Sequence, residues 1–502
     1  MLFLQSQMWK SKSYVLGKEA GNSLLFLKGK IMGKDTIAGI ASGMGGGIGV
    51  IRISGENALK VIGEIFRCKN NIVSGKINPL ADWDEDYFYH QNSHTIHYGF
   101  IVNDDGNVLD EVMVLVMKNP KSYTCEDVIE IDSHGGPFLV QKILELILKH
   151  NVRLAEPGEF TKRAFLNGRI DLSQAEAVMN MISSKNDFAL DSAINQLEGR
   201  VSQFIQTLRD KLLYQMGYIE SALDDPEHYS LDGFSESLYS VVSEIDQELT
   251  SLLNRFEQGR LKSEGINTVI IGKPNAGKSS LMNLLMDEER AIVTNIAGTT
   301  RDILEETVHL GNIILNLVDT AGIHETEDLV ESLGVEKAKE CIMGADFIIY
   351  VVDVNDEFSD ADQQIIDLIQ GKKGIILFNK SDLDIKINFD LYKDALGWDY
   401  LSFSSTKGNG LTELEEYITS KYLQGDITYN DQIYITNVRH KDAVYSAHES
   451  LVQVLQAIDD GMTEDIFMVD LMDAYRSLGL INGETATEDL VNLIFKEFCM
   501  GK

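Results

Sequence analysis

Hydrophobic and polar residues follow three different patterns along the 502-residue chain. Residues 35 to 152 contain short apolar runs separated by polar and glycine-rich segments, which predicts strands with few helices. In residues 153 to 265 the apolar positions recur with a helical period, and this period returns in residues 424 to 502. Between them, in residues 266 to 423, strand and helix patterns alternate as a doubly wound parallel sheet requires. We therefore expect a multidomain protein with an N-terminal α+β domain, an all-α helical domain and an α/β domain.

The first region yields specific elements. A helix is expected over residues 138 to 149, because Pro137 suits the first turn of a helix. The preceding Gly135-Gly136 pair either binds an anion at the helix N-terminus or supplies a left-handed turn. Four strands are expected, over residues 36 to 42, 48 to 54, 110 to 117 and 128 to 132.

The two helical regions are expected to form one domain. Asp171-Leu172-Ser173-Gln174 has the composition of a capping box and is followed by apolar residues that share one helix face. The C-terminal stretch of roughly seventy residues has little core of its own. The simplest arrangement is therefore a single helical domain into which the α/β region is inserted.

Bulk composition narrows the class of protein. The net charge of −34 would repel a nucleic acid over most of the surface, so any such contact must be local. The four cysteines have no paired spacing, which argues against disulfides and zinc and for a reducing cytoplasm. No apolar run approaches a membrane span, and we expect no membrane association. Residues 1 to 34 hold six lysines and one acid and are expected to be a disordered extension, or to precede a later start at Met32.

A phosphate-binding loop is predicted at residues 272 to 279. An apolar run precedes the Gly-x-x-x-x-Gly-Lys-Ser pattern, and a helical pattern follows it. The glycines let backbone N–H groups approach phosphate oxygens, Lys278 adds a positive charge, and Ser279 offers a hydroxyl to Mg²⁺. The predicted nucleotide contacts of this loop are Asn275, Ala276, Gly277, Lys278, Ser279 and Ser280.

Two further elements would sense the terminal phosphate. Asp319 ends an apolar run and can hold Mg²⁺ through water, and Gly322 lets the backbone reach the γ-phosphate. The polar loop before them can close over Mg²⁺ with a hydroxyl, for which we choose Thr300, and such loops order when the γ-phosphate is present. The predicted contacts here are Thr294, Asn295, Ile296, Ala297, Gly298, Thr299, Thr300, Asp319, Thr320, Ala321 and Gly322.

The base is predicted to be guanine. An apolar run over residues 375 to 378 ends in Asn379-Lys380-Ser381-Asp382, and the Asp382 carboxylate can accept hydrogen bonds from guanine N1–H and N2–H₂. Adenine lacks these donors and would leave the carboxylate unpaired. The next strand is followed by Ser404-Ser405-Thr406, which can seal the guanine edge. Because all elements occur in order at strand ends, we predict a GTP site.

This arrangement resembles the GTPases of the translation-factor class, in particular the TrmE-Era-EngA branch. Ras-like proteins carry a water-orienting glutamine where this chain has Ile323, so another group must assist hydrolysis. The resemblance implies a K⁺ ion in dimerised GTPase domains, catalysis by Lys278, and Glu331 as the residue that positions water. Glu331 has an equal claim to being a solvated acid at a helix start. The K⁺ ligands implied are Asn275, Thr294, Ile296 and Thr299.

Over residues 35 to 502 the chain resembles the bacterial and organellar tRNA-modification GTPases. The segments that carry the resemblance are residues 35 to 38, 49 to 55, 122 to 124, 126 to 130, 134 to 137, 157 to 169 and the terminal 498 to 502. The resemblance implies a homodimer whose N-terminal domain, residues 35 to 152, binds tetrahydrofolate and dimerises. It also implies a heterotetramer with the flavoprotein MnmG (GidA), which alone would carry FAD, and an aminomethyl-type modification at C5 of the tRNA wobble uridine.

Four residues match the folate contacts of that family, and the donor would be a 5-formyl or 5,10-methylene derivative. An arginine or lysine can pair a glutamyl carboxylate, and a glutamate can accept paired donors from the pterin. Cys499 matches a cysteine from which a covalent adduct is chemically possible, although a small apolar residue packed beside Phe498 fits it as well. The folate residues are Arg52, Glu130, Arg169 and Lys502.

Two other functions are alternatives to tRNA modification. A ribosome-assembly GTPase of the Era or EngA type would need an RNA-binding module or a second GTPase domain in place of the helical C-terminal region. A membrane-remodelling GTPase would need an apolar paddle or a basic face. Candidate sites for tRNA docking are Lys162, Arg163 and residues 439 to 441, although each also reads as a solvated patch.

Overall fold

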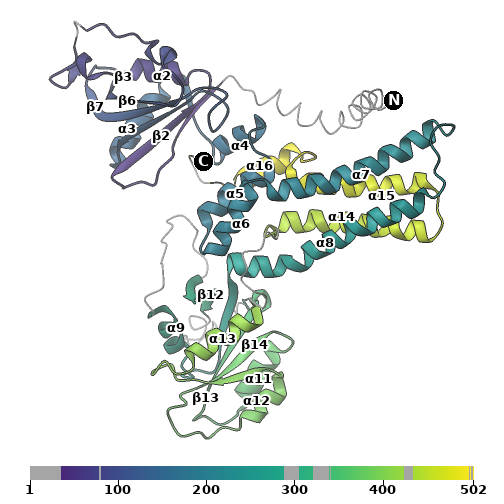
Figure 1. Cartoon of the computed structure of the whole chain (residues 1–502). Helices are drawn as coiled ribbons and strands as arrows, with labels where there is room; N and C mark the ends of the chain where they lie inside the picture. The colour runs from purple at the N-terminus through teal and green to yellow at the C-terminus, as the bar shows by residue number, and fades with distance from the viewer. Residues whose placement is uncertain are drawn as a thin grey trace. The chain divides into compact units, whose positions relative to one another are not determined.

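The structure is a computed structural model that divides into two units (Figure 1). The first unit comprises Met1–Ile182, Ile194–Leu249 and Asp442–Lys502, and the second comprises Ser183–Ala193 and Thr250–Lys441. The residues that the structure describes are 35–78, 81–287, 305–311, 313–319, 339, 341–422, 434–496, 498 and 501. The α+β, all-α and inserted α/β parts that the sequence predicts are all present, so the predicted fold class is confirmed.

The first unit opens with a seven-stranded sheet of order β3-β6-β7-β8-β2-β1-β9. Its neighbours pair antiparallel except β1 and β9, which are parallel. Helices α2 (Ala58–Ile65) and α3 (Pro137–Leu148) contribute to the same apolar core as this sheet. The strands are β1 (Thr36–Ile40), β2 (Ile48–Ser54), β3 (Phe66–Arg67), β6 (Thr95–Val102), β7 (Val108–Met117), β8 (Val128–His134) and β9 (Val152–Leu154).

Among the described residues, one face of this sheet is covered by α2 and α3, and the other is covered only near β1, where Ile37 is buried with Ala155 and Phe160. Alternate residues of the central strands, such as Ile51 and Val114, are fully buried against α2 and α3. The opposite face carries large apolar side chains that stay exposed, with Ile96 at 66%, Tyr98 at 55% and Met113 at 44%. Away from β1, the sheet therefore presents an uncovered face that is partly apolar.

The four predicted strands exist with ends shifted by a few residues, and the predicted helix is α3. Strands β3, β6 and β9 were not predicted. In β6 glycine, histidine and tyrosine interrupt the apolar residues, and β9 is only three residues long and pairs with β1 across more than one hundred residues of sequence. The short pairs β4 (Ile72–Val73) and β5 (Lys76–Ile77), with 3₁₀ turns at Lys69–Asn71 and Tyr87–His90, complete this part.

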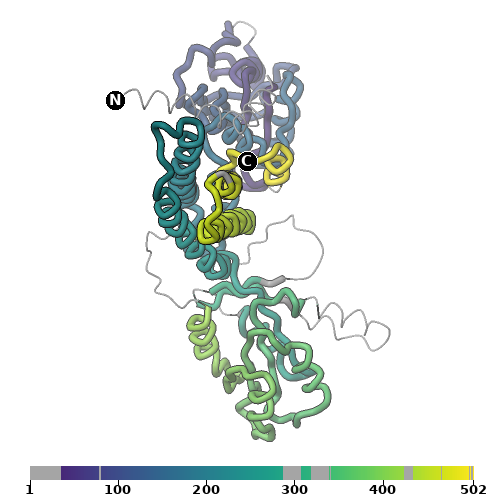
Figure 2. Tube along the Cα trace, turned by 90° about the vertical axis from the view of Figure 1, so that its right-hand side faces the viewer, coloured from purple at the N-terminus to yellow at the C-terminus, as the bar shows by residue number. Residues whose placement is uncertain are grey.

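The remainder of the first unit is helical, and Figure 2 shows its helices running side by side. Helix α7 packs along α15, and the buried Arg209 of α7 forms an ion pair of 2.6 Å with Glu484. His448 of α14 meets Asp246 of α8 at 2.6 Å. The helices are α4 (Glu159–Leu166), α5 (Leu172–Ser183), α6 (Asp187–Leu197), α7 (Arg200–Asp224), α8 (Phe234–Glu264), α14 (Val438–Asp459), α15 (Glu464–Asn482) and α16 (Glu488–Lys496), and parts of α5, α6, α8 and α14 belong to the second unit.

Helix α5 begins at the predicted capping box. The Asp171 backbone N–H donates to Gln174 Oε1 at 3.0 Å, and the Gln174 N–H donates to Asp171 Oδ1 at 2.8 Å. These reciprocal bonds satisfy two backbone donors that a helix start leaves unpaired. The helix start predicted from the sequence is therefore confirmed.

The second unit holds a six-stranded sheet of order β11-β12-β10-β13-β14-β15, parallel except for the edge strand β11. Helices α9 (Lys278–Asp287) and α13 (Leu411–Tyr422) pack into one core, and α11 (Asp360–Ile369) and α12 (Phe389–Leu396) into another. No helix among the described residues is long and apolar enough to span a membrane. The strands are β10 (Ile266–Ile271), β11 (Glu305–Leu310), β12 (Ile313–Asp319), β13 (Phe347–Asp353), β14 (Gly374–Asn379) and β15 (Asp399–Ser402).

Candidate functional site

The predicted phosphate loop joins the end of β10 to the start of α9. Gly277 has a φ of 101° and lies against the Asn379 side chain, so a side chain at this position would collide with it. The Lys278 ammonium donates to the carbonyls of Gly272 and Lys273, both at 2.9 Å, which holds it over the loop. The loop thus combines a helix N-terminus, close backbone approach and a fixed cation, as a phosphate site requires.

The Asn379 side chain connects this loop to the predicted guanine elements. Its Nδ2 donates to the Ala276 carbonyl at 2.8 Å. Its Oδ1 accepts from the Ser405 backbone N–H at 3.0 Å and from the Ser405 hydroxyl at 2.9 Å. Asn379 is 1% exposed. This residue, predicted as a nucleotide contact, therefore braces two nucleotide loops against each other.

Asp382 is held beside the second of these loops. The Ser404 hydroxyl donates to Asp382 Oδ1 at 2.8 Å, and the Lys407 ammonium lies 3.7 Å from Oδ2. The hydrogen bond from Ser404 lowers the pKa of Asp382 below its ordinary value, and Lys407 contributes in the same direction. The group is therefore ionised at neutral pH, as acceptance of two guanine N–H donors requires. Thr406 joins the group through a 3.3 Å contact between its hydroxyl and that of Ser404.

Two lysines near the site have partners that the sequence did not reveal. Lys380, at φ 62°, pairs with Asp353 at the end of β13 at 2.6 Å. Lys273 pairs with the buried Asp362 of α11 at 2.8 Å and with Asp356 at 2.6 Å. Burial alone would lower the pKa of Lys273, but these carboxylates raise it, so the loop is anchored by a charged residue. In the sequence, the only sign of this anchoring role was the position of Lys273 within the phosphate-loop motif.

The structure describes some of the other predicted site residues. Ser279 and Ser280 lie exposed at the start of α9, and Asp319 ends β12 as predicted. The predicted residues that lie outside the described ranges are Thr294, Asn295, Ile296, Ala297, Gly298, Thr299, Thr300, Thr320, Ala321, Gly322, Glu331, Cys499 and Lys502.

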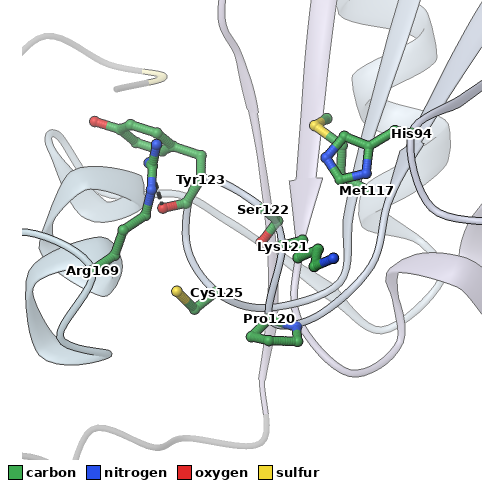
Figure 3. A pocket seen from close by; sticks show the side chains of 8 residues that line it. All are labelled: His94, Met117, Pro120, Lys121, Ser122, Tyr123, Cys125 and Arg169. Atoms are coloured by element: carbon green, nitrogen blue, oxygen red, sulfur yellow. Dashed lines mark hydrogen bonds between the residues drawn. The ribbon is translucent and has the colours of Figure 1, made fainter.

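A second cluster lies on the face of the N-terminal sheet opposite α2 and α3, and its Arg52 and Glu130 side chains are 16% and 20% exposed. Arg52 of β2 and Glu130 of β8 are cross-strand neighbours and form an ion pair with Nε–Oε1 of 2.7 Å. The Tyr123 ring lies between two guanidinium groups, 5.5 Å from that of Arg52 and 4.8 Å from that of Arg169. Arg169 Nη1 also donates to the Tyr123 carbonyl at 2.9 Å, as Figure 3 shows. Two of the four residues predicted to contact folate, Arg52 and Arg169, therefore lie against one aromatic ring that the sequence reasoning missed, and a third, Glu130, pairs with Arg52.

The C-terminus approaches the same cluster. Arg52 Nη1 donates to the Gly501 carbonyl at 3.4 Å. Gly501, at φ 85°, lies so close to the Ile40 carbonyl that a side chain would not fit. The buried Phe498 belongs to a core with Phe165 and Phe495. The residue before Lys502 is thereby placed next to Arg52, although Lys502 itself is not described.

Residues 122 to 126, the Tyr123 loop, are held by α4. Arg163 is buried, and its Nη1 lies 3.1 Å from both carboxylate oxygens of Glu126. Its Nη2 donates to Asp35 and Glu159, each at 3.0 Å. Burial alone would lower the pKa of Arg163, but the three carboxylates raise it. From the sequence, Arg163 was a candidate for tRNA docking or for a solvated surface charge. The structure shows instead that it is buried and ion-paired.

Two further contacts fix the Tyr123 loop. Asn167 Nδ2 donates to the Thr124 carbonyl at 2.6 Å, and the Tyr123 hydroxyl lies 2.9 Å from the Thr161 hydroxyl. Cys125 has a φ of 59°, a conformation that non-glycine residues seldom adopt. The other docking candidates are also engaged, since Lys162 donates to Asn492 at 2.7 Å and His440 is buried.

Comparison with known proteins identifies the family. Residues 172–499 match the family described as the MnmE helical domain, and residues 36–169 match the GTP-binding protein TrmE N-terminus. A tRNA modification GTPase MnmE of Lachnoclostridium phytofermentans is 51% identical over 94% of this chain and 100% of its own length. The chain belongs to the MnmE family of tRNA modification GTPases. It is accordingly a GTP-binding, GTP-hydrolysing enzyme of tRNA modification.

Other relatives of this chain carry the same name, tRNA modification GTPase MnmE. Proteins of that name from Clostridioides difficile and Bacillus mycoides are 47% and 42% identical, each over 93% of this chain and 99% of their own length. Solved structures resemble smaller parts. Aquifex aeolicus Era bound to GDP and AlF₄⁻ is 26% identical over 37% of this chain and 66% of its own, with a TM-score of 0.25. The G domain of Thermotoga maritima FeoB is 26% identical over 32% of this chain and 99% of its own, also with a TM-score of 0.25.

Proposed function

We propose that this member of the MnmE family works as a homodimer with the flavoprotein MnmG, as a heterotetramer, to modify C5 of the tRNA wobble uridine. GTP hydrolysis, stimulated by K⁺, would drive the cycle, and a 5-formyl or 5,10-methylene tetrahydrofolate would supply the one-carbon unit. FAD would enter only with the partner. The observation that carries the proposal is the Arg52–Glu130 pair with Tyr123 and Arg169, a ligand-binding arrangement in a chain that also holds a GTPase.

The donor set of this cluster fits a folate. A pterin offers neighbouring N–H donors, and Glu130 is a partly exposed carboxylate of which Arg52 holds Oε1. Tyr123 supplies a flat apolar surface for an aromatic ring. Arg52, Arg169 and, at the chain end, Lys502 supply charge for the glutamyl carboxylate. These residues bind and orient the ligand, and the one-carbon unit is the chemistry that the folate would supply.

The GTPase residues fit their predicted ions. Ser279 is exposed and would bind Mg²⁺ together with Thr300, and Asp319 would hold the ion through water. Asn275, at φ 62°, is exposed, and its side chain has no hydrogen-bond partner among the described residues, which suits a K⁺ ligand shared with Thr294, Ile296 and Thr299. Lys278 and Glu331 would assist hydrolysis, Lys278 by charge and Glu331 by holding water. Asp382, with Ser404, Ser405 and Thr406, would select guanine.

The uncovered sheet face supports the homodimer. Ile96, Tyr98 and Met113 are exposed on adjacent strands that bury their other face against helices. A contiguous apolar face of this kind is expected to be covered by a partner, and a second copy of the chain brings the same face. We place the protein in the cytoplasm, where Cys68, Cys125 and Cys341 would remain the free thiols that the structure shows.

The direct test is complementation of a bacterial strain that lacks its own MnmE, with nucleoside mass spectrometry of its tRNA. The unaltered chain should restore the modified wobble uridine, and Arg52→Ala should not. Lys142→Ala provides a matched control, because Lys142 is an exposed cation on α3 that pairs only with Glu145 on the same helix. Failure of the unaltered chain, with MnmG present, would reject the proposed reaction.

A second assay addresses the cation. GTP turnover by the purified full chain should be higher in KCl than in NaCl at equal ionic strength, and Asn275→Ala should reduce the difference. Equal rates in both salts would reject the K⁺ part and leave the tRNA modification untouched.

A further inference from the structure

One pocket of about 520 Å³ opens beside the Tyr123 loop. Figure 3 shows Tyr123 and Arg169 on one side of it and His94 and Met117 on the other, with the 120–125 segment between them. The volume lies within the range of small-molecule sites. We call this hollow the basic pocket because its ionisable lining residues, apart from Tyr123 and the Cys125 thiol, are His94, Lys121 and Arg169.

The charge of this lining is unusual for the chain. No Asp or Glu is among the lining residues, although acids outnumber Lys and Arg by 78 to 44 in the sequence. Among the described residues, the Lys121 ammonium has no ion pair, and Arg169 makes only its contacts with Tyr123. Lys121 and Arg169 thus line the pocket with no acidic side chain among its lining residues, which favours an anionic ligand over a cationic one.

The acids nearest in sequence are occupied elsewhere. Glu126 accepts from Arg163 at 3.1 Å and from the Ser54 hydroxyl at 2.6 Å. Asp127 Oδ1 accepts from the Asn119 backbone N–H at 2.9 Å, and Glu130 pairs with Arg52. Each of these carboxylates therefore has a partner other than Lys121 or Arg169.

We propose that the basic pocket binds the γ-linked glutamate tail of the folate donor and so makes the enzyme selective for folates that carry several glutamates. This inference rests on the proposed folate site. Tyr123 and Arg169 belong to both places, so a ligand whose ring lies by Arg52 and Glu130 directs its tail past Arg169 toward Lys121 and His94. Each added glutamate brings one carboxylate, for which Arg169 offers a planar donor and Lys121 a point charge.

The expected gain is modest because the pocket is open to solvent. An exposed ion pair contributes at most about a fivefold factor to an affinity. Two such pairs, with the usual screening by salt, predict about three- to tenfold tighter binding of a tail with three glutamates than of a tail with one. The difference should shrink at high salt.

The test is equilibrium binding of 5-formyl-tetrahydrofolate with one or three glutamates to the full-length protein. The triglutamate should bind about three- to tenfold more tightly. Lys121→Ala removes one of the two ion pairs and should lower the ratio to about two- to threefold, whereas Lys142→Ala should retain the full ratio. Equal affinities of the two ligands for the unaltered protein would overturn the inference, whereas absence of binding by both would overturn the proposed folate function.

Cys125 gives a second readout in the unaltered protein, because it lines the pocket. At concentrations that saturate the folate site, the triglutamate form of 5-formyl-tetrahydrofolate should slow alkylation of Cys125, mapped by mass spectrometry, more than the monoglutamate form does, and leave Cys68 unaffected. Equal protection by the two forms would reject the glutamate tail as the ligand of this pocket.

Discussion

Two loops of this enzyme are each held by one buried polar side chain, but the two side chains differ in charge. Asn379, a neutral amide, joins the phosphate loop to the Ser405 loop through three hydrogen bonds. Arg163 fixes the Tyr123 loop through ion pairs with Asp35, Glu126 and Glu159. Both residues are nearly inaccessible to solvent.

The difference has energetic consequences. A buried amide with all its partners costs little to desolvate, and each of its bonds adds a net of about 1 kcal/mol. A buried ion-pair network is costly to form, and removing one member leaves the others charged without partners. Asn379 therefore joins the two nucleotide loops through bonds that do not titrate, whereas the hold of Arg163 on the Tyr123 loop depends on the ionisation of its carboxylate partners.

Replacing Arg163 should have the largest effect. Arg163→Met keeps much of the apolar stem but leaves three carboxylates near a buried position, so the N-terminal part should lose about 3 to 5 kcal/mol of unfolding free energy. The measurement is urea unfolding followed by the fluorescence of Trp83, with Trp9 and Trp398 replaced by Phe.

Arg153 supplies the matched control for this change. It contacts Asp35 at 2.8 Å and Glu159 at 2.7 Å, but its side chain is 44% exposed. Arg153→Met should therefore cost at most about 1 kcal/mol. Similar losses for both variants would show that burial of Arg163 does not distinguish the two arginines.

Replacing Asn379 should act on nucleotide binding. Asn379→Ala removes three hydrogen bonds and leaves the Ala276 carbonyl and the Ser405 N–H without their partner, so GTP affinity should fall by about 2 to 3 kcal/mol, or roughly 30- to 200-fold. Equilibrium binding of a fluorescent GTP analogue measures the loss. Asn388→Ala, in an exposed cap of α12, is the control and should leave this affinity unchanged. An unaltered affinity in Asn379→Ala would show that the brace is dispensable for binding.

The nucleotide loops were predictable because their signals are local. The phosphate loop and the Asp382 element each follow an apolar run, and parallel strands bring such ends to one edge of the sheet. The doubly wound order followed from the same alternation of strands and helices. The bracing role of Asn379 was not predictable, because its partners lie 103 and 26 residues away and the motif gives only its position.

The residues of the N-terminal cluster could be predicted from the sequence only in part. Resemblance to a family pointed to Arg52, Glu130 and Arg169, but no pattern in the sequence indicated that Tyr123 lies between the arginines. Arg163 looked like a surface charge because its acids stand 128, 37 and 4 residues away. An ion-pair network assembled from distant segments leaves no periodic signal, and its members appear in the sequence as ordinary charged residues.

An effect of similar size is expected on the choice of base. Asp382→Asn replaces a carboxylate, held by Ser404 at 2.8 Å, with an amide that cannot accept both guanine donors. GTP should bind about 100-fold more weakly, while xanthosine triphosphate, whose extra carbonyl can accept from the new amide, should bind more tightly than before. Competition binding with the two nucleotides measures this. Parallel weakening of both would indicate that the loop, rather than base recognition, had been damaged.

The smallest of the four effects is the dependence of folding stability on pH, and it distinguishes most directly between the loop held by Arg163 and the loops joined by Asn379. Burial raises the pKa of Glu159, but the hydrogen bond from Arg153 and the charge of Arg163 outweigh it, and the pKa lies below its ordinary value of 4.5. The pKa of Asp35 is likewise lowered by Arg153 and Arg163 despite burial. A carboxyl group whose pKa is lower in the folded state contributes stability above its unfolded pKa and loses it as the pH falls through the folded pKa.

The N-terminal part should therefore become less stable as the pH falls from about 5 toward 3. In Arg153→Met the pKa of Glu159 should rise toward its ordinary value, so the same measurement with Trp83 should show a shallower dependence on pH. The three hydrogen bonds of Asn379 contain no group that titrates in this range, and Asn379→Ala should leave the slope unchanged. If Arg153→Met kept the full slope, other carboxylates would have to carry the acid sensitivity of the N-terminal part.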